Sequence, residues 1–304
     1  MAVASSILVI LGPTASGKSE LAMAVARQRG GEILSVDSMQ VYRGMDIGTA
    51  KPTAAERAEV IHHLIDVVGP DEPFTVAQFV ERADCVIADA RARNVPLIVT
   101  GGTPLYYKAL FQGLFTGPSA DETVRAHLRL QTNEQLHKEL QRVDPDAAGR
   151  IHINDSKRLI RALEVWQLTG RPISSFQTEW ESAASRHPAA WFGLLWDKET
   201  LNRRINARVK EMLASGWLDE VRALVQQFGA LSPTAAEATG YRELLDHLAG
   251  KISLQDAAEQ IKIATRQLAR RQMKWFRQFP NVTWLEGEKG LENLPRILDR
   301  AGPL

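Results

Sequence analysis

A glycine-rich segment near the start of the chain carries the strongest chemical signal. Residues 12–19 read GPTASGKS and fit the phosphate-binding pattern G-x-x-x-x-G-K-[ST], with an apolar run before it and a helical pattern after it. In such a loop, backbone N–H groups and the positive end of the following helix bind phosphate oxygens. Lys18 would neutralise phosphate charge, and the Ser19 hydroxyl would ligate Mg²⁺. The predicted phosphate-binding residues are Gly12, Pro13, Thr14, Ala15, Ser16, Gly17, Lys18 and Ser19.

A carboxylate is placed unusually for this type of loop. NTPases and kinases hold Mg²⁺ with a second acid, at the end of an apolar strand. The apolar run 95–100 instead leads into Thr-Gly-Gly-Thr at 100–103, and the acid, Asp37, follows the run 33–36. The carboxyl ends of parallel strands line one ligand crevice, so we expect Asp37 to face the phosphate loop. It would hold a metal or accept a proton from a nucleophile, and a turn or helix-cap role remains open.

The elements that must position these residues alternate between strand and helix. Apolar runs predict strands over 7–11, 33–36, 95–100, 191–196 and 282–285. Helical spacing predicts helices over 20–27, 75–93, 198–215, 217–229, 237–249, 253–260, 260–279 and 290–300. This order indicates an α/β fold, a P-loop-containing core in which a parallel β-sheet is flanked by helices.

The middle of the chain has a different pattern of apolar residues. Residues 121–168 contain no strand-like run and three helical patterns, over 121–131, 133–142 and 155–168. We therefore expect an all-helical insertion domain over 115–189. The P-loop catalytic core would then comprise 1–114 and 190–304.

Composition excludes several classes of protein. The chain has 304 residues, of which 44% are hydrophobic and 24% charged, as in an ordinary globular protein. No apolar run approaches 18 residues, so no membrane span is expected. The single cysteine, Cys85, excludes a disulfide framework or a multi-cysteine metal site and fits a reducing, cytoplasmic location. We expect Cys85 to be buried in the helix over 75–93.

Charge is unevenly distributed along the chain. The formal net charge is +1, yet residues 260–279 carry six basic residues and no acid, so the remainder is net negative by about five charges. Four of the six, at 262, 266, 270 and 274, repeat every four residues and would form one stripe of a helix. Such a stripe is typical either of phosphate contacts with a nucleic acid or of a solvated surface.

Seven blocks of the sequence, in order, resemble the bacterial tRNA dimethylallyltransferase family, also called tRNA isopentenyltransferases. The resemblance spans nearly the whole chain. The blocks are GPTASGKS (12–19), SVDSMQVYRGMDIGTAKP (35–52), GGTPLYYKAL (101–110), DPDAAGRIHINDSKRLIRALEVWQLTGRP (144–172), LNRRINARVKEMLASGWLDEV (201–221), TGYREL (239–244) and ATRQLARRQMKWFR (264–277).

The resemblance implies a prenyl transfer that depends on Mg²⁺. A dimethylallyl group would pass from dimethylallyl diphosphate to N6 of the adenosine 3′-adjacent to the anticodon, and diphosphate would leave. Asp37 would be the general base, acting with Thr14, Lys18 and Arg208, while Ser19 would hold the metal. Arg204, one helical turn before Arg208, is a second candidate for the diphosphate.

The resemblance also implies contacts with the anticodon stem-loop of tRNA. Polar residues such as Gln40 would read the edges of neighbouring bases. We expect a monomer with no obligate protein partner. The implied tRNA-binding residues are Asp37, Ser38, Met39, Gln40, Thr103, Arg125, Lys157, Arg158, Leu159, Ile160 and Arg161.

Three alternatives remain from the sequence. An adenylate isopentenyltransferase would prenylate free AMP, ADP or ATP and would not need the helical insertion or the basic stretch 260–279. A P-loop nucleotide kinase would need the acid that residues 100–103 lack. A non-catalytic RNA-binding protein would have no use for an intact Lys18, Ser19 and Asp37.

Overall fold

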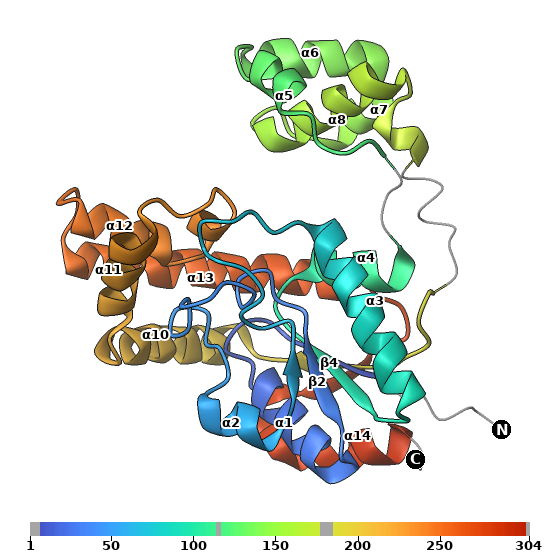
Figure 1. Cartoon of the computed structure of the whole chain (residues 1–304), viewed down its shortest axis with the longest axis vertical. Helices are drawn as coiled ribbons and strands as arrows, with labels where there is room; N and C mark the ends of the chain where they lie inside the picture. Colours follow the sequence, from blue (N-terminus) through green and yellow to red (C-terminus); the bar gives the residue numbers. More distant parts are fainter. Residues whose placement is uncertain (1–6, 114–116, 177–184, 302–304) are drawn as a thin grey trace. The chain divides into compact units, whose positions relative to one another are not determined.

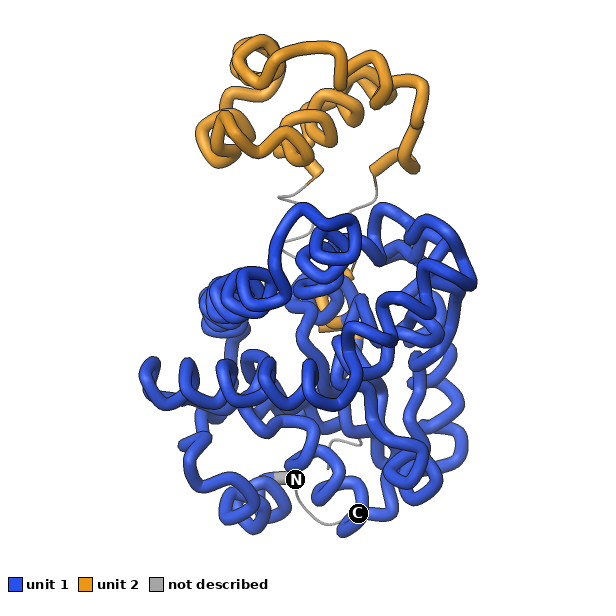
Figure 2. Tube along the Cα trace, turned by 90° about the vertical axis from the view of Figure 1, so that its left-hand side faces the viewer, with its two compact units in different colours: residues 1–110, 187–304 blue, residues 111–186 orange. Residues whose placement is uncertain are grey.

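The chain folds into two compact units. The computed structural model describes residues 7–113, 117–176 and 185–301 (Figure 1). The core unit comprises residues 1–110 and 187–304, and the helical unit comprises residues 111–186 (Figure 2). The boundaries predicted at 115 and 189 therefore lie four and three residues from the boundaries in the structure.

A six-stranded parallel sheet organises the core unit, in the order β3-β2-β4-β1-β5-β6. Strand β1 is a continuous buried apolar run, and residues 33–34 of β2 and 97–99 of β4 are buried and apolar beside it, because helices cover both faces of the sheet. Thr100 pairs with Ile10 on one side and with Ser35 on the other, so the loops after β1, β2 and β4 begin at the same level. The strands are β1 (Ile7–Leu11), β2 (Glu32–Ser35), β3 (His62–His63), β4 (Leu97–Thr100), β5 (Ala190–Leu195) and β6 (Thr283–Glu286).

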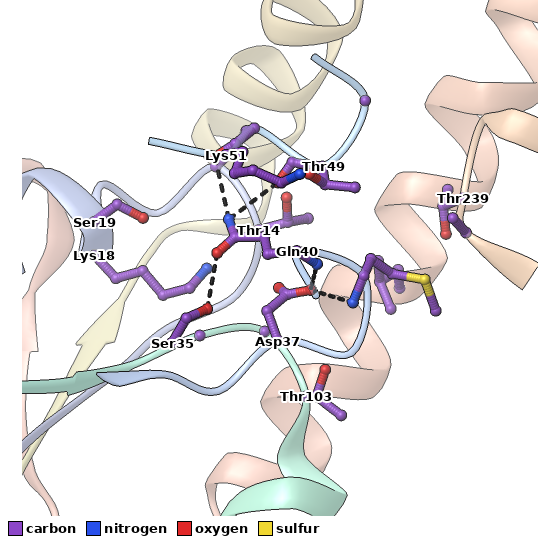
Figure 3. Close-up of a pocket in the computed structure, with 18 of the residues that line it drawn as sticks. Thr14, Lys18, Ser19, Ser35, Asp37, Gln40, Thr49, Lys51, Thr103 and Thr239 are labelled. Atoms are coloured by element: carbon purple, nitrogen blue, oxygen red, sulfur yellow. Dashed lines mark hydrogen bonds between the residues drawn. The ribbon is translucent and has the colours of Figure 1, made fainter. Parts of the chain in front are cut away.

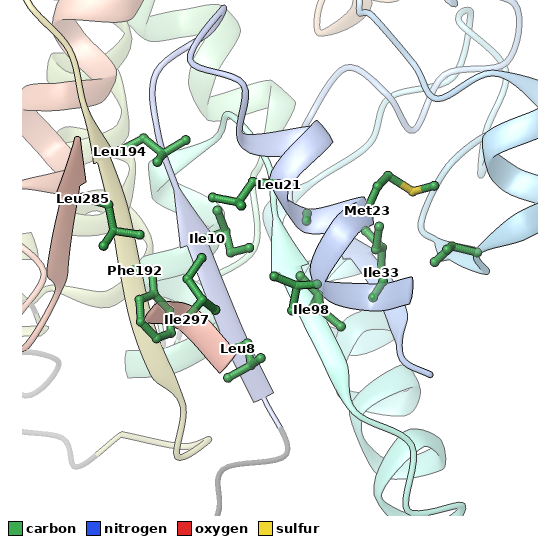
Figure 4. Packing of buried hydrophobic residues seen from close by; sticks show 14 residues of the cluster. Leu8, Ile10, Leu21, Met23, Ile33, Ile98, Phe192, Leu194, Leu285 and Ile297 are labelled. Atoms are coloured by element: carbon green, nitrogen blue, oxygen red, sulfur yellow. The ribbon is translucent and has the colours of Figure 1, made fainter. Parts of the chain in front are cut away.

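Helices α1 (Lys18–Arg29) and α14 (Leu294–Ala301) pack on one face of this sheet. Alternate strand residues such as Ile10, Ile98 and Phe192 meet Leu21 of α1 and Ile297 of α14 in one buried cluster (Figure 4). Strand residues alternate between faces, so their neighbours point to the opposite side of the sheet.

On that opposite face, aromatic side chains join β5 to α4 (Pro104–Gln112) and α13 (Leu254–Phe276). The Trp191 ring stacks on Phe279, and Tyr107 of α4 contacts Phe276 of α13 edge-to-face. Such aromatic contacts fix how helices seat on a sheet. The helices and 3₁₀ segments that begin or end in the core unit are α1 (Lys18–Arg29), α2 (Ala54–Glu59), α3 (Val76–Ala92), α4 (Pro104–Gln112), α10 (Lys198–Ala214), α11 (Trp217–Phe228), η1 (Ala235–Glu237), α12 (Tyr241–Leu248), α13 (Leu254–Phe276), η2 (Gly287–Asn293) and α14 (Leu294–Ala301).

Three details of the core unit differ from expectation. The two helices predicted over 253–260 and 260–279 are one helix, α13, because no glycine or proline interrupts its apolar stripe. Cys85 is exposed, since Ala83 and Ile87 of α3 face the core and Cys85 lies between them on the opposite side. Helices α2 and α4 were not expected. No helix in the described ranges has the length and apolar character needed to cross a membrane.

The helical unit is all-helical where the structure describes it. It includes helices α5 (Glu122–Leu128), α6 (Asn133–Val143), α7 (Pro145–Arg150) and α8 (Ser156–Thr169), and residues 173–176 are also helical. The short α7 was not expected, and Asp144 starts it by accepting a hydrogen bond from the Ala147 N–H. A buried cluster containing Leu136, Leu140 and Leu163 forms a separate core.

The two ends of the helical unit meet. The Arg186 N–H donates a hydrogen bond to the Phe111 carbonyl oxygen at 2.8 Å. The chain therefore leaves and re-enters the core unit at neighbouring points.

Candidate active site

A cavity of about 350 Å³ opens where β1, β2 and β4 end in the core unit. The common level of these strand ends brings their loops together, as parallel α/β sheets generally do. Lys18, Asp37 and Thr103 approach the cavity from the three loops (Figure 3). Arg208 of α10 and Gln272 of α13 complete its lining.

The phosphate loop is preformed. Ala15 and Gly17 have positive φ angles of 64° and 85°, which turn the chain sharply into α1. A side chain at Gly12 would place its Cβ 2.4 Å from the Ser16 hydroxyl, so the loop requires glycine there. Gly17 caps α1 without a side chain, which leaves the first N–H groups of the helix available to a ligand.

Two side chains brace this loop from outside the cavity. Trp196 Nε1 donates to the Ser16 carbonyl oxygen at 3.0 Å, and Arg204 Nε donates to the Ala15 carbonyl oxygen at 2.9 Å. The Arg204 guanidinium also lies 4.5 Å from the centre of the Trp196 ring. Of the two predicted arginines, Arg208 lines the cavity and Arg204 does not. Direct contact of Arg204 with a diphosphate stays a prediction, whereas its support of the loop is observed.

Two cations face the cavity without full neutralisation. The Lys18 ammonium donates to the Pro13 carbonyl oxygen at 3.3 Å. Burial, followed by repulsion from Arg208, lowers the pKa of Lys18 to about 8, and attraction to Asp37 only partly offsets this. Burial likewise lowers the pKa of Arg208, although Asp37 and Glu211 act in the opposite direction. A bound anion would favour the charged form of both groups, as a diphosphate site requires.

Asp37 presents one carboxylate oxygen to the cavity. Its Oδ1 accepts hydrogen bonds from the N–H groups of Met39 at 2.9 Å and Gln40 at 3.4 Å, which fixes the side chain (Figure 3). None of the described residues donates a hydrogen bond to Oδ2. A Cβ at Gly102 would lie 3.0 Å from Oδ2, so the glycine keeps this oxygen accessible. The arrangement is suited to accepting a proton from a substrate.

Ser38 and Gln40, which follow Asp37, form hydrogen bonds with other residues of the core unit. Thr103 Oγ1 accepts from the Ser38 N–H at 2.9 Å and bonds to the Ser38 hydroxyl at 3.1 Å. Gln40 Nε2 donates to the carbonyl oxygens of Thr49 and Ala50, and its Oε1 accepts from the Ser35 hydroxyl. The amide of Gln40 therefore braces a cavity wall, and in this structure it is not free to read a base edge as predicted.

That wall, residues 46–51, depends on residues that the sequence analysis missed. Glu220 accepts hydrogen bonds from three successive N–H groups, at positions 46–48, and from the Tyr241 hydroxyl. The Lys51 ammonium bridges Asp46 and Asp66, at 2.6 Å from each. Glu220 and Lys51 lie inside the blocks that carry the family resemblance. The N–H partners of Glu220 are more than 170 residues away, whereas Asp46 and Asp66 lie 5 and 15 residues from Lys51.

Gln272 is the other missed residue. Its side chain contacts both the phosphate loop and the loop after β4. It lies in the basic stretch 260–279, which we interpreted only by its charges. Its contacts are with residues 258 and 170 positions away, so the sequence did not indicate them.

The basic stretch is only partly a surface stripe. Lys262 is buried and forms an ion pair with Glu259, so its predicted place on an exposed stripe is wrong. Arg266 donates to the Asn206 side chain at 2.6 Å. The basic residues of this stretch that remain exposed are Arg270, Arg271, Lys274 and Arg277, and Arg271 also lines the cavity.

The predicted RNA-binding residues of the helical unit fall into two groups. Lys157 and Arg158 are exposed at the start of α8, and Ile160 is half-buried. Leu159 is 0% exposed and lies in the hydrophobic cluster, so its predicted contact with tRNA is wrong for the side chain.

Arg125 and Arg161 bind a buried carboxylate within the helical unit. Glu164 is 0% exposed and accepts from Arg125 Nε at 2.8 Å and Arg161 Nη1 at 2.6 Å. The Asp121 N–H donates to the same carboxylate at 2.8 Å. These arginines thus stabilise the fold of the unit, and any contact they make with tRNA would use their remaining N–H groups.

Family comparisons agree with this geometry. The family described as IPP transferase matches residues 40–279, and the one described as Isopentenyl transferase matches residues 5–67. The tRNA dimethylallyltransferase of Geobacter metallireducens is 47% identical over 284 residues, which are 92% of each chain. That of Geobacter sulfurreducens is 43% identical over 96% of each chain.

Solved structures agree as well. The tRNA isopentenylpyrophosphate transferase of Bacillus halodurans is 36% identical and has a TM-score of 0.72, over 98% of this chain and 97% of that one. A eukaryotic dimethylallyltransferase acting on tRNA is 29% identical with a TM-score of 0.79, over 92% of this chain and 73% of that one. The P-loop core, the helical unit and these matches together show that the chain belongs to the bacterial tRNA dimethylallyltransferase (IPP transferase) family.

Proposed function

We propose that this enzyme transfers a dimethylallyl group from dimethylallyl diphosphate to N6 of the adenosine 3′-adjacent to the anticodon of tRNA. One observation carries the proposal: an anion-binding loop with two incompletely neutralised cations faces an accessible Asp37 Oδ2 across one cavity. No acid follows β4, where a phosphoryl-transfer enzyme would hold its metal. The site therefore suits departure of a diphosphate from carbon.

In the proposed reaction the N6 lone pair attacks C1 of the dimethylallyl group, and the C1–O bond breaks. The bonding electrons leave with the diphosphate, whose growing charge Lys18, Arg208 and the loop N–H groups stabilise. The N6 proton passes to Asp37 Oδ2. An exocyclic amine is a weak nucleophile, so a fixed base beside it is needed.

Mg²⁺ would bind together with the diphosphate. Within the described residues no group of three or more His, Cys, Asp or Glu side chains could hold a metal. The Ser19 hydroxyl lines the cavity and would be one ligand, and Mg²⁺ is commonly held by few protein oxygens plus phosphates and waters. Bound there, the ion would neutralise charge on the leaving group.

Each unit offers basic surface for tRNA, and we place the enzyme in the cytoplasm with that substrate. In the core unit, the exposed basic residues are Arg270, Arg271, Lys274 and Arg277, and Arg271 lines the cavity. In the helical unit, Lys157 and Arg158 are exposed. The target base must leave its stack to reach a cavity, which costs least in a loop of unpaired bases.

One assay separates the candidate activities. Purified enzyme would be mixed with Mg²⁺, labelled dimethylallyl diphosphate and either unmodified tRNA or AMP. We expect label in tRNA alone. Label only in AMP would identify an adenylate isopentenyltransferase, and consumption of ATP with a nucleoside monophosphate, without prenyl transfer, would identify a kinase.

A further inference from the structure

Gln272 joins two loops of the active site. Its side chain is 4% exposed and reaches the cavity from α13. Its Oε1 accepts a hydrogen bond from the Thr14 N–H at 2.8 Å, and its Nε2 donates to the Gly102 carbonyl oxygen at 2.6 Å. Thr14 belongs to the phosphate loop after β1, and Gly102 belongs to the loop after β4.

The chemistry of the two contacts requires an amide. One partner is a donor and the other an acceptor, and a neutral amide supplies one acceptor and one donor at once. The two backbone groups also fix which way the amide faces. Without it, two partly buried main-chain groups would lose their side-chain partner.

The contacts lie beside the reacting groups. A Cβ built on Gly102 would lie 2.9 Å from Gln272 Nε2 and 3.0 Å from Asp37 Oδ2, so the amide and the carboxylate border the same small space. Thr14 is four residues before Lys18 in the loop proposed to hold the diphosphate. The Gln272 side chain thus ties the leaving-group loop to the edge of the base's pocket.

We propose that Gln272 is a positioning residue for the prenyl transfer, which holds the phosphate loop and the loop beside Asp37 at a fixed separation. The inference rests on the proposed function. In-line attack needs N6, C1 and the diphosphate aligned, and the two loops hold opposite ends of that line. A displacement of about 1 Å at such a site costs on the order of a hundredfold in rate.

The first test replaces the amide by an apolar side chain of similar size. Gln272→Leu should lower kcat about a hundredfold, while the Kd for tRNA and the thermal midpoint stay close to those of wild type. Gln267→Leu, on an exposed position of the same helix, is the matched control and should change none of these. A kcat within twofold of wild type for Q272L, or a loss matched by the fraction unfolded, would overturn the inference.

The second test uses pH. In Gln272→Glu the protonated acid donates and accepts as the amide does, whereas the carboxylate repels the Gly102 oxygen. The rate of Q272E relative to wild type should rise as pH falls through the pKa of the new carboxyl, and the relative rate of Q272L should not. Parallel profiles for the two variants would argue against positioning.

The two levels of the hypothesis fail differently. If wild-type enzyme does not prenylate tRNA, the proposed function is wrong. If wild-type enzyme prenylates tRNA and both Gln272 variants do so at wild-type rates, only the role of Gln272 is wrong.

Discussion

Both units contain buried charged groups, but the helical unit favours the charged form and the core unit disfavours it. In the helical unit, Glu164 receives hydrogen bonds from two arginines and one backbone N–H. Burial alone would raise the pKa of Glu164, yet the bonds from Arg125 and Arg161 outweigh it and the pKa is lowered. In the core unit, burial dominates at Lys18 and Arg208, and their pKa values are lowered because no adequate anion lies beside them.

The difference separates structural charge from functional charge. When the surroundings of a buried group favour its charged form, neighbouring groups compensate that charge. Removing the group then leaves its partners uncompensated and destabilises the fold. A buried group whose charged form is disfavoured makes the free protein less stable, and a ligand of opposite charge removes that penalty. On this basis Glu164 has a structural role in its unit, whereas Lys18 and Arg208 are suited to binding an anionic substrate.

The largest expected effect is at the base. Asp37→Asn keeps an oxygen to accept from the N–H groups of Met39 and Gln40 but cannot take a proton. We expect kcat to fall about a thousandfold, while tRNA binding is retained. Single-turnover transfer and a filter-binding assay measure the two quantities. Transfer within a few-fold of wild type would show that another group accepts the proton.

The next effect tests the structural charge. Glu164→Gln leaves Arg125 and Arg161 without their buried counter-ion, so the helical unit should lose about 3 kcal/mol of stability. Hydrogen exchange over residues 122–169 measures this in the full chain. Glu122→Gln, which breaks an exposed pair with Arg129, is the control and should cost much less, because solvent screens that pair. Equal losses in both variants would show that Glu164 is not a structural charge.

Removing the functional charge of Lys18 should lower activity without lowering stability. Lys18→Met should reduce kcat/KM for dimethylallyl diphosphate about a hundredfold. Since it removes a buried cation that lacks a full counter-charge, the thermal midpoint should stay constant or rise. Differential scanning calorimetry beside the transfer assay tests both parts. A lower midpoint would identify Lys18 as a structural charge.

The smallest effect concerns pH. With its pKa near 8, Lys18 in the free enzyme loses its charge as pH rises above 8, so kcat/KM for the diphosphate should decline there. Because an unfolded lysine keeps its proton to about pH 10.5, the destabilisation caused by the buried charge of Lys18 is relieved between pH 8 and 10.5, and stability rises with pH there. The pKa of Glu164 is also lowered, so its slope has the same sign in a more acidic range: its contribution is present above the unfolded pKa and is lost as pH falls through its lowered pKa. A flat kcat/KM profile from pH 7 to 9.5 would contradict the part assigned to Lys18.

Local patterns account for what the sequence predicted. The phosphate loop is one continuous motif, and Asp37 follows from the rule that parallel strands end at one edge. Neither inference needs knowledge of distant contacts.

The missed features depend on tertiary contacts. Gln272 bonds to Thr14, 258 residues away, and Glu220 bonds to the loop at 46–48. Arg125 could be expected on an RNA surface until its partner Glu164, 39 residues away, was seen. Side chains that join distant loops leave no periodic trace in a single sequence, so only the folded chain reveals them.

The bond between Arg186 and Phe111 has a consequence for evolution. A segment whose two ends meet is inserted at a single position of the core unit, as a long loop would be. Residues between those ends are free to lengthen, shorten or be exchanged without a new register in the parallel sheet. The tRNA contacts proposed for this segment could therefore change while the phosphate loop and Asp37 keep their geometry.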